Sequence, residues 1–250
     1  MTKRQLLMKH ILFSMTLAFG LLAGSTSVLA SEGGPELPSA GVNLHDQASL
    51  QRGARLFFNY CVGCHSLKFQ RYSRIGEDLG LTEKEVMDNL NFTGAKFGEP
   101  VISHMPAEMA QQWFGKAPPD LSLVVRARTA DWVYGYLNSF YIDPSRPVGW
   151  NNTVFPNASM PFPLWELQGV QTAVRKAGSE DVEKLEPAQP GRMTPAQYQQ
   201  AARDLTNFLA YVSEPAAMQR HSYGVWVLLF LALFTLLAYA LKKEYWKDVH

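Results

Sequence analysis

The sequence predicts a mainly α-helical body with long loops, followed by a single C-terminal transmembrane helix. Three observations support this fold class. Several segments place apolar residues three and four positions apart, as on one face of an α-helix, whereas alternating apolar strands are scarce. A long loop rich in Pro and Asn is expected over residues 143–163. Residues 223–241 carry no charged side chain, which is typical of a membrane-spanning helix.

The composition is that of a folded protein without a basic surface. Of the 250 residues, 47% are apolar and 18% are charged, which excludes a disordered chain. The body, residues 31–220, carries 17 basic and 20 acidic side chains, a net charge of −3. Nucleic-acid binding requires a basic patch or stripe, so we expect no nucleic-acid partner. The length of the body suits one domain better than two.

The first thirty residues have the three parts of an export signal. Three Lys or Arg residues lie within the first nine positions, an apolar run follows over residues 11–22, and small residues lead to Ala30. We expect residues 1–30 to be a signal peptide that is cleaved after Ala30. An uncleaved anchor is the alternative, but the apolar run is shorter than the ~20 residues that cross a bilayer.

The C-terminal stretch predicts a membrane anchor and its orientation. The uncharged residues 223–241 are 19 in number, enough at about 1.5 Å per residue to cross a ~30 Å hydrocarbon core. Three lysines follow directly within 242–247, and such residues stay on the cytoplasmic side. We expect a transmembrane helix over 221–241, a cytoplasmic tail over 242–250 and the body, residues 31–220, outside the cytoplasm. A buried core helix would leave these lysines unexplained.

Four helices are predicted within the body. Asp46 precedes the first, which ends near the two cysteines. The last is the best marked, because Thr194 and Gln197 can form a capping box and Pro195 suits the first helical position. Residues 31–41, rich in Gly, Pro and Ser, predict a mobile lead-in before these helices. The predicted helices cover residues 46–61, 82–90, 131–141 and 194–212.

The segment Cys61-Val62-Gly63-Cys64-His65 is the attachment motif of a c-type haem. Two thiols one helical turn apart can add to the two vinyl groups on one edge of the porphyrin, and the adjacent imidazole then faces the iron. We expect Cys61 and Cys64 to bind haem covalently and His65 to be an axial ligand. Covalent attachment also suits an oxidising exterior, because two exposed cysteines there are expected to be bonded, for example as thioethers, rather than to remain free thiols.

Two other interpretations of the motif are open. A thioredoxin-like dithiol has the same Cys spacing but is expected beside a βαβ pattern, whereas this pair follows an amphipathic helix. A structural zinc site needs further Cys or His ligands, and His45, His104 and His221 form no clustered pattern with the motif.

A low-spin haem needs a second axial ligand, and methionine in that place raises the reduction potential. Met105 and Met160 are the candidates, because each is followed by a proline that stiffens the chain. A single methionine more often fills a core than binds a metal. The residues alone leave both candidates open, with Met160 preferred because it lies in the Pro-rich loop.

Beyond the haem motif, the sequence resembles the cytochrome c1 family, the haem subunits of the bacterial cytochrome bc complex (quinol:cytochrome c oxidoreductase). The resemblance covers nearly all of the chain after the export signal. A Pro-Pro-Asp-Leu-Ser segment combined with Arg-Ala-Arg and one C-terminal anchor is far more specific than the haem motif. The segments that carry the resemblance are Gln51-Arg52-Gly53, Tyr60, Ser66-Leu67, Arg71-Tyr72, Ala117-Pro118-Pro119-Asp120-Leu121-Ser122, Val125-Arg126-Ala127-Arg128, Met160-Pro161 and Ala210-Tyr211-Val212-Ser213-Glu214-Pro215.

The resemblance implies a cytochrome c-like haem domain with one haem c and assigns four further residues to it. Met160 is implied as the second ligand of the iron, opposite His65. Arg128 is implied as the partner of one haem propionate and Trp132 as a neighbour of the other. The segment that contains Pro119 is implied to pack on the His65 side, where a backbone carbonyl accepts the Nδ1–H of the imidazole.

The resemblance also implies a function. Family members take one electron from the Rieske iron–sulfur protein and pass it to cytochrome c, beside cytochrome b, with no catalytic chemistry of their own. We expect the haem domain on the periplasmic side of the bacterial inner membrane, with the anchor in lipid. Acidic residues are expected to steer a basic cytochrome c. They are Glu77, Asp78, Glu83, Glu85, Asp88, Glu180, Asp181, Glu183 and Glu186.

Two other functions are compatible with the motif and the anchor. One is another membrane-anchored monohaem cytochrome that feeds a terminal oxidase. The other, from a different class, is a tethered thiol–disulfide oxidoreductase.

Overall fold

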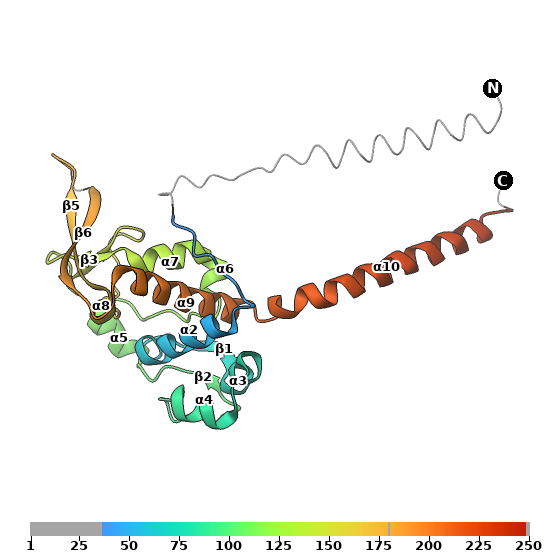
Figure 1. Cartoon of the computed structure of the whole chain (residues 1–250), viewed down its shortest axis with the longest axis horizontal. Helices are drawn as coiled ribbons and strands as arrows, with labels where there is room; N and C mark the ends of the chain where they lie inside the picture. Colours follow the sequence, from blue (N-terminus) through green and yellow to red (C-terminus); the bar gives the residue numbers. More distant parts are fainter. Residues whose placement is uncertain (1–36, 180, 249–250) are drawn as a thin grey trace. The chain divides into compact units, whose positions relative to one another are not determined.

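The computed structural model describes residues 37–179 and 181–248 (Figure 1). The signal peptide expected over residues 1–30 lies outside the described part of the chain.

The described end of the predicted lead-in is packed on the body. Ala40 is buried, and its backbone N–H donates to Asp131 Oδ1 at 2.7 Å. The side chain of Leu37 lies against Gly135. The prediction of a mobile lead-in is therefore wrong for residues 37–41, because a hydrogen bond to the half-buried Asp131 carboxylate and apolar packing hold this segment.

Two long helices, α2 (Gln47–Tyr60) and α9 (Pro195–Ser213), pack against each other in the body (Figure 1). Phe57 and Phe58 of α2 meet Phe208 of α9, with ring centroids 5.8 and 6.4 Å from that of Phe208. All three side chains are at most 2% exposed. Burying a phenylalanine side chain contributes about 1.5–3 kcal/mol, so this contact is a main support of the core.

Both helices begin at the predicted caps. Asp46 accepts the Ser49 N–H at 3.0 Å at the start of α2. Thr194 and Gln197 form the reciprocal capping box of α9. These predictions are confirmed because capping depends on neighbouring residues only. Helix α2 ends at Tyr60, so the haem motif begins on its last turn.

The close approach of α2 to α9 depends on Gly53. A Cβ atom at this position would lie 2.0 Å from the Asp204 carbonyl oxygen and 2.7 Å from Phe208 Cβ. Beside it, the buried Asp204 carboxylate accepts hydrogen bonds from Arg52 Nε at 2.6 Å and from Ser49 Oγ at 2.7 Å. Close backbone packing and a charged hydrogen-bond cluster thus tie the two helices together.

The other helices of the described body are shorter, and the predicted mainly helical fold is confirmed. The helix predicted over 82–90 is present with the capping box of Thr82 and Glu85. The shorter helices are α3 (Tyr72–Leu79), α4 (Glu83–Asn89), α5 (Ala107–Phe114), α6 (Val124–Arg128), α7 (Ala130–Asn138) and α8 (Trp165–Gln168).

Helix α7 ends three residues before the end of the predicted helix 131–141. Two asparagine side chains satisfy its last-turn carbonyls, since Asn138 Nδ2 donates to Tyr134 O at 2.7 Å and Asn152 Nδ2 donates to Tyr136 O at 2.8 Å. Side-chain bonds of this kind compete with continuation of a helix. The chain then turns into a short strand instead of completing the predicted helix.

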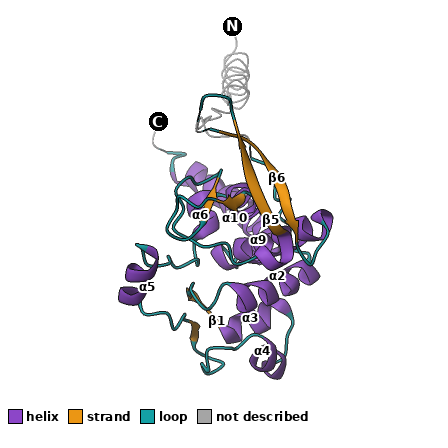
Figure 2. Ribbon diagram, turned by 90° about the vertical axis from the view of Figure 1, so that its left-hand side faces the viewer, coloured by secondary structure: helices purple, strands orange, loops and turns teal. Residues whose placement is uncertain are grey.

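The strands form three two-stranded antiparallel sheets within the described residues. The largest is a long hairpin that the sequence analysis missed (Figure 2). Its second strand is exposed at almost every position, so it lacks the apolar alternation by which a strand is recognised. The sheets pair β1 (Leu67–Arg71) with β2 (Pro100–Val101), β3 (Phe140–Ile142) with β4 (Trp150–Asn152), and β5 (Gly169–Arg175) with β6 (Val182–Pro190).

The predicted loop over 143–163 is ordered by two buried asparagines. Asn152 Oδ1 accepts the backbone N–H groups of Val154 and Phe155 at 2.9 and 3.0 Å. Asn151 Oδ1 accepts the N–H of Asn157 at 2.8 Å. These bonds replace regular secondary structure inside the loop, which apart from β4 remains irregular.

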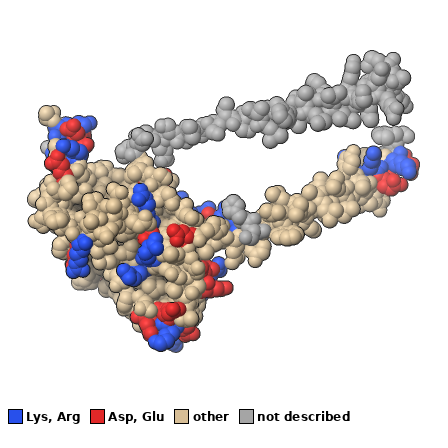
Figure 3. Space-filling view, viewed as in Figure 1, with Lys and Arg blue, Asp and Glu red and all other residues tan. Residues whose placement is uncertain are grey.

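Helix α10 (Ala217–Tyr245) contains the predicted membrane span. Its stretch Tyr223–Tyr245 is long and apolar enough to cross a membrane, and none of it is buried in the described protein. In Figure 3 its visible face carries no charged side chain along its middle. The helix extends past the span expected over 221–241, so the first residues of the expected tail, 242–250, are helical.

We expect Gly53→Ala to destabilise the protein by about 1–3 kcal/mol or more, because the new Cβ overlaps the backbone of α9. Thermal or denaturant unfolding of the purified full chain measures this effect. Gly98→Ala is the matched control, since a Cβ there meets nothing within 4 Å. Equal stability of the two variants would contradict the close-packing role of Gly53.

Candidate haem site

The haem motif follows α2 as a compact turn. The N–H groups of Cys64 and His65 both donate to the Cys61 carbonyl, at 3.0 and 2.8 Å. Cys61 is buried, and Cys64 is partly exposed beside it. One backbone turn, anchored to the core by α2, therefore presents both thiols and the imidazole.

The His65 imidazole is fixed by one hydrogen bond to the backbone. Its Nδ1 donates to the Pro119 carbonyl at 2.8 Å, and the side chain is buried. A carbonyl can only accept, so the proton lies on Nδ1 and the lone pair of Nε2 is available. Burial lowers the pKa of His65, which favours the neutral ring that binds metals. The structure thus brings together the two residues expected to meet here.

The Pro-Pro-Asp-Leu-Ser segment is held in place by its own polar side chains. Asp120 Oδ2 accepts the N–H of Lys68 at 2.8 Å, and Ser122 Oγ accepts the N–H of Phe69 at 3.1 Å. The N–H of Leu121 donates to the carbonyl of residue 66 at 2.9 Å. These bonds pair the segment with the strand that follows the haem motif, which keeps the Pro119 carbonyl next to His65.

The surroundings of the two thiols differ from those of a reactive dithiol. Burial raises the pKa of Cys61 to about 12, and burial also raises the pKa of Cys64. Disulfide oxidoreductases need a lowered thiol pKa, so the environment argues against the oxidoreductase interpretation. In the ranges that the structure describes, no group of three or more His, Cys, Asp and Glu side chains could hold a metal ion, which argues against a zinc site.

The two candidate methionines lie in different surroundings. Met160 packs against the core, and its Sδ accepts a hydrogen bond from the Tyr136 hydroxyl at 3.5 Å. The N–H of Met105 donates to Ser103 Oγ at 3.2 Å, and that hydroxyl donates to the Gly63 carbonyl at 2.8 Å. Met105 is therefore tied to the haem motif through its backbone, whereas Met160 contacts a ring cluster through its thioether.

Arg128 and Trp132 lie together. The Arg128 guanidinium carbon is 5.3 Å from the centre of the Trp132 ring and 5.8 Å from that of Phe155. Arg128 is exposed, and no described carboxylate lies within ion-pair distance of it. A guanidinium held by rings and without a carboxylate partner can bind a bidentate anion such as a propionate. Neither a surface nor a core ion pair, the alternative role for this arginine, is present for Arg128 among the described residues.

Sequence reasoning missed two parts of the site. Tyr136 stacks on Trp132 with ring centroids 5.0 Å apart and 8° between the planes. The spacing of Arg128, Trp132 and Tyr136 at four-residue intervals is a signal that could have found it. The backbone-binding roles of Asp120 and Ser122 could not be found, because their partners are about fifty residues away in the sequence.

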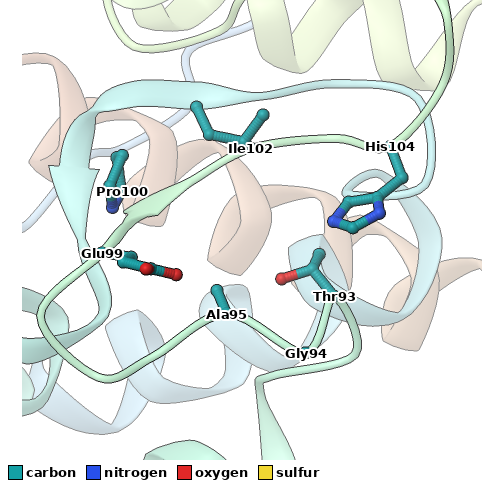
Figure 4. A pocket seen from close by; sticks show the side chains of 7 residues that line it. All are labelled: Thr93, Gly94, Ala95, Glu99, Pro100, Ile102 and His104. Carbon is teal, nitrogen blue, oxygen red and sulfur yellow. The ribbon is translucent and has the colours of Figure 1, made fainter.

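The structure also contains an open hollow of about 420 Å³ (Figure 4). None of the predicted haem-binding residues lines it, although His104 does. Its lining residues are Thr93, Gly94, Ala95, Glu99, Pro100, Ile102 and His104.

The residues at the motif fit a covalent haem. The Nε2 atom of His65 has no hydrogen-bond partner among the described residues, and both nearby thiols are unpaired. A buried neutral imidazole with a free ring nitrogen is the form in which histidine binds iron.

The sequence matches one protein family and is similar to known proteins along most of its length. Residues 39–249 match the Cytochrome C1 family. The chain is 48% identical to cytochrome c1 of Allochromatium vinosum, over 94% of this chain and 99% of that protein. It is 42% identical to a Nitrosomonas europaea protein named ammonia monooxygenase gamma subunit, over 86% and 89%. It is 29% identical to cytochrome c1 of Rhodospirillum rubrum, over 91% and 96%.

The family match spans the described body from residue 39 onward and all of α10, and the haem motif lies within it. The chain therefore belongs to the cytochrome c1 family, the membrane-anchored subunits that carry one covalent haem c and transfer electrons in quinol:cytochrome c reductase.

Proposed function

We propose that Cys61 and Cys64 form the two thioether bonds to the haem and that His65 and Met160 are its axial ligands. The observation that carries this assignment is the buried His65 ring, whose Nδ1–H is held by a carbonyl so that Nε2 is free beside two unpaired thiols. The bound haem supplies a one-electron redox couple. The chain itself provides the ligands and fixes their orientation.

Arg128 and Trp132 are proposed to hold the haem propionates. Arg128 offers two parallel N–H donors to a carboxylate. Its position over Trp132 and Phe155 keeps the guanidinium ordered without using its hydrogen bonds. The positive charge of Arg128 would compensate the negative charge of a propionate bound there.

Electrons are proposed to arrive from a Rieske iron–sulfur protein and to leave to cytochrome c. Fewer acidic residues are free to attract a basic cytochrome c than the sequence suggests, because four of them have partners within the chain. Asp78 and Asp88 pair with basic side chains of their own helices, Glu85 caps α4, and Glu186 pairs with Lys184. Any steering of a basic partner therefore depends on the remaining acidic residues, such as Glu83.

We also propose the topology of the chain. Residues 1–30 direct export and are removed, the haem domain lies in the periplasm, and α10 crosses the bacterial inner membrane to a cytoplasmic end. The exposed apolar stretch Tyr223–Tyr245 and the lysines near its end support this orientation. Contact of this stretch with cytochrome b is proposed as its role beyond anchoring.

We expect Met160→Leu to abolish the methionine–iron charge-transfer band of the oxidised protein, because leucine has no sulfur to bind iron. Absorption spectra of the purified, haem-loaded full chain measure the band. Met105→Leu is the matched control and should keep it. A band that survives in Met160→Leu and disappears in Met105→Leu would reverse the assignment of the second axial ligand.

Asp120→Ala should lower the free energy of unfolding by roughly 1.5–3 kcal/mol, the range for a hydrogen bond to a charged group. The variant loses the bonds from the N–H groups of Lys68 and Ser122, and with them the support of Pro119. Denaturant unfolding followed by the haem absorbance tests this. Asp88→Ala, which removes an exposed helical ion pair, should change stability little. Equal effects of the two would rule out the proposed support.

The full chain should copurify with cytochrome b and a Rieske iron–sulfur protein from membranes solubilised in a mild detergent. This outcome follows from the proposed partners, and mass spectrometry of an affinity-tagged preparation measures it. Copurification with a terminal oxidase, or with a monooxygenase in the absence of cytochrome b, would overturn the proposed partners.

A further inference from the structure

The Tyr136 hydroxyl has one hydrogen-bond partner in the described structure, the sulfur of Met160. The donor oxygen and the acceptor sulfur are 3.5 Å apart, within the range expected for a sulfur acceptor. Thioether sulfur accepts hydrogen bonds only weakly. The need of the Tyr136 hydroxyl for a hydrogen-bond partner therefore does not by itself explain why this tyrosine lies beside Met160.

The ring of Tyr136 is held from several sides, so its hydroxyl has little freedom to turn away. Trp132 stacks on one face at 5.0 Å, and the Phe140 ring meets it edge-on at 4.8 Å. The backbone carbonyl of Tyr136 accepts Asn152 Nδ2–H at 2.8 Å, which joins α7 to the loop before Met160. Contacts of this kind fix the side chain by packing rather than by the weak sulfur bond.

The surroundings keep the hydroxyl a donor. The ring lies among aromatic side chains, and no described charged side chain is within hydrogen-bond distance of the hydroxyl. The Met160 sulfur has no proton to give, so the Tyr136 hydroxyl is the donor in this contact.

A thioether sulfur has two lone pairs, and binding to iron uses one of them. The second can accept the Tyr136 O–H, which withdraws electron density from the sulfur. A sulfur with less density is a poorer donor to the oxidised iron and so favours the reduced state. We propose that Tyr136 is a positioning residue that raises the haem reduction potential by donating a hydrogen bond to the sulfur of Met160.

Tyr136 also connects the two proposed parts of the haem environment. Arg128 lies over Trp132, Trp132 stacks on Tyr136, and Tyr136 contacts Met160. The residues proposed for the propionates are therefore connected by direct contacts to Met160, one of the two residues proposed for the iron. Because Tyr136 acts through Met160, this role rests on the function proposed above.

The test compares Tyr136→Phe with the unchanged full chain, both loaded with haem. Phenylalanine keeps the ring and its stacking but removes the donor. We expect the charge-transfer band to remain and the equilibrium between the oxidised and reduced forms to shift about threefold toward the oxidised form, a fall of ~28 mV at 59 mV per tenfold. Potentiometric titration followed by absorbance measures both. Tyr141→Phe, a buried tyrosine of β3 without a hydrogen bond to Met160, should leave the potential unchanged.

An unchanged potential in Tyr136→Phe, or an equal fall in Tyr141→Phe, would overturn the role of Tyr136. Loss of the band in Tyr136→Phe would also overturn it, because the hydroxyl would then be needed to keep Met160 on the iron rather than to tune the potential. If Tyr136→Phe cannot be loaded with haem, 3-fluorotyrosine at position 136 provides the second variant. Its hydroxyl is a stronger donor, so the potential at mildly acidic pH should rise, and no rise would contradict the proposal.

Met160→Leu separates failure of this role from failure of the ligand assignment. If that variant keeps the charge-transfer band, Met160 is not the ligand and both proposals fail. If it loses the band while Tyr136→Phe keeps the original potential, the ligand assignment stands and the role of Tyr136 alone is refuted.

Discussion

The hydrogen bond from His65 Nδ1 to the Pro119 carbonyl is the interaction on which the site depends. It places the proton on one ring nitrogen and leaves the other free for iron, so orientation and protonation state of the ligand are set together. The bond exists because Asp120 and Ser122 join their segment to the strand after the haem motif. The segment that contains Asp120 and Ser122, far from the cysteines in the sequence, thus determines the orientation of the His65 ring.

The core positions this arrangement through α2 and α9. Gly53 lets the helices approach, and the Asp204 cluster fixes their relative position. Because the haem motif leaves the last turn of α2, any shift of that helix would move both thiols and the imidazole. On the other side, the stack of Trp132 and Tyr136 connects α7 to Met160. Rigid packing therefore supports both proposed ligand sides, as a fast electron carrier needs when its coordination must not change between oxidation states.

Features with local causes could be predicted from the sequence. The caps at Asp46 and Thr194 and the uncharged span of α10 each depend on a few neighbouring residues, and the structure contains them. The end of α7 and the β5–β6 hairpin could not be predicted, because asparagine bonds end the helix and an exposed strand has no apolar alternation. The same limit applies to the site. The motif predicts the two thiols and the His65 ligand, whereas the contact between Tyr136 and Met160 becomes visible only when the loop is folded.

The central claim is that a haem is bonded through sulfur to Cys61 and Cys64. The most direct measurement is the intact mass of the purified chain after extraction with acidified acetone, a treatment that removes haem held only by its iron. With both thioether bonds in place, we expect a chain that remains coloured and heavier than the polypeptide by the mass of one haem. A colourless chain with the mass of the polypeptide alone, and pigment in the extract, would contradict it.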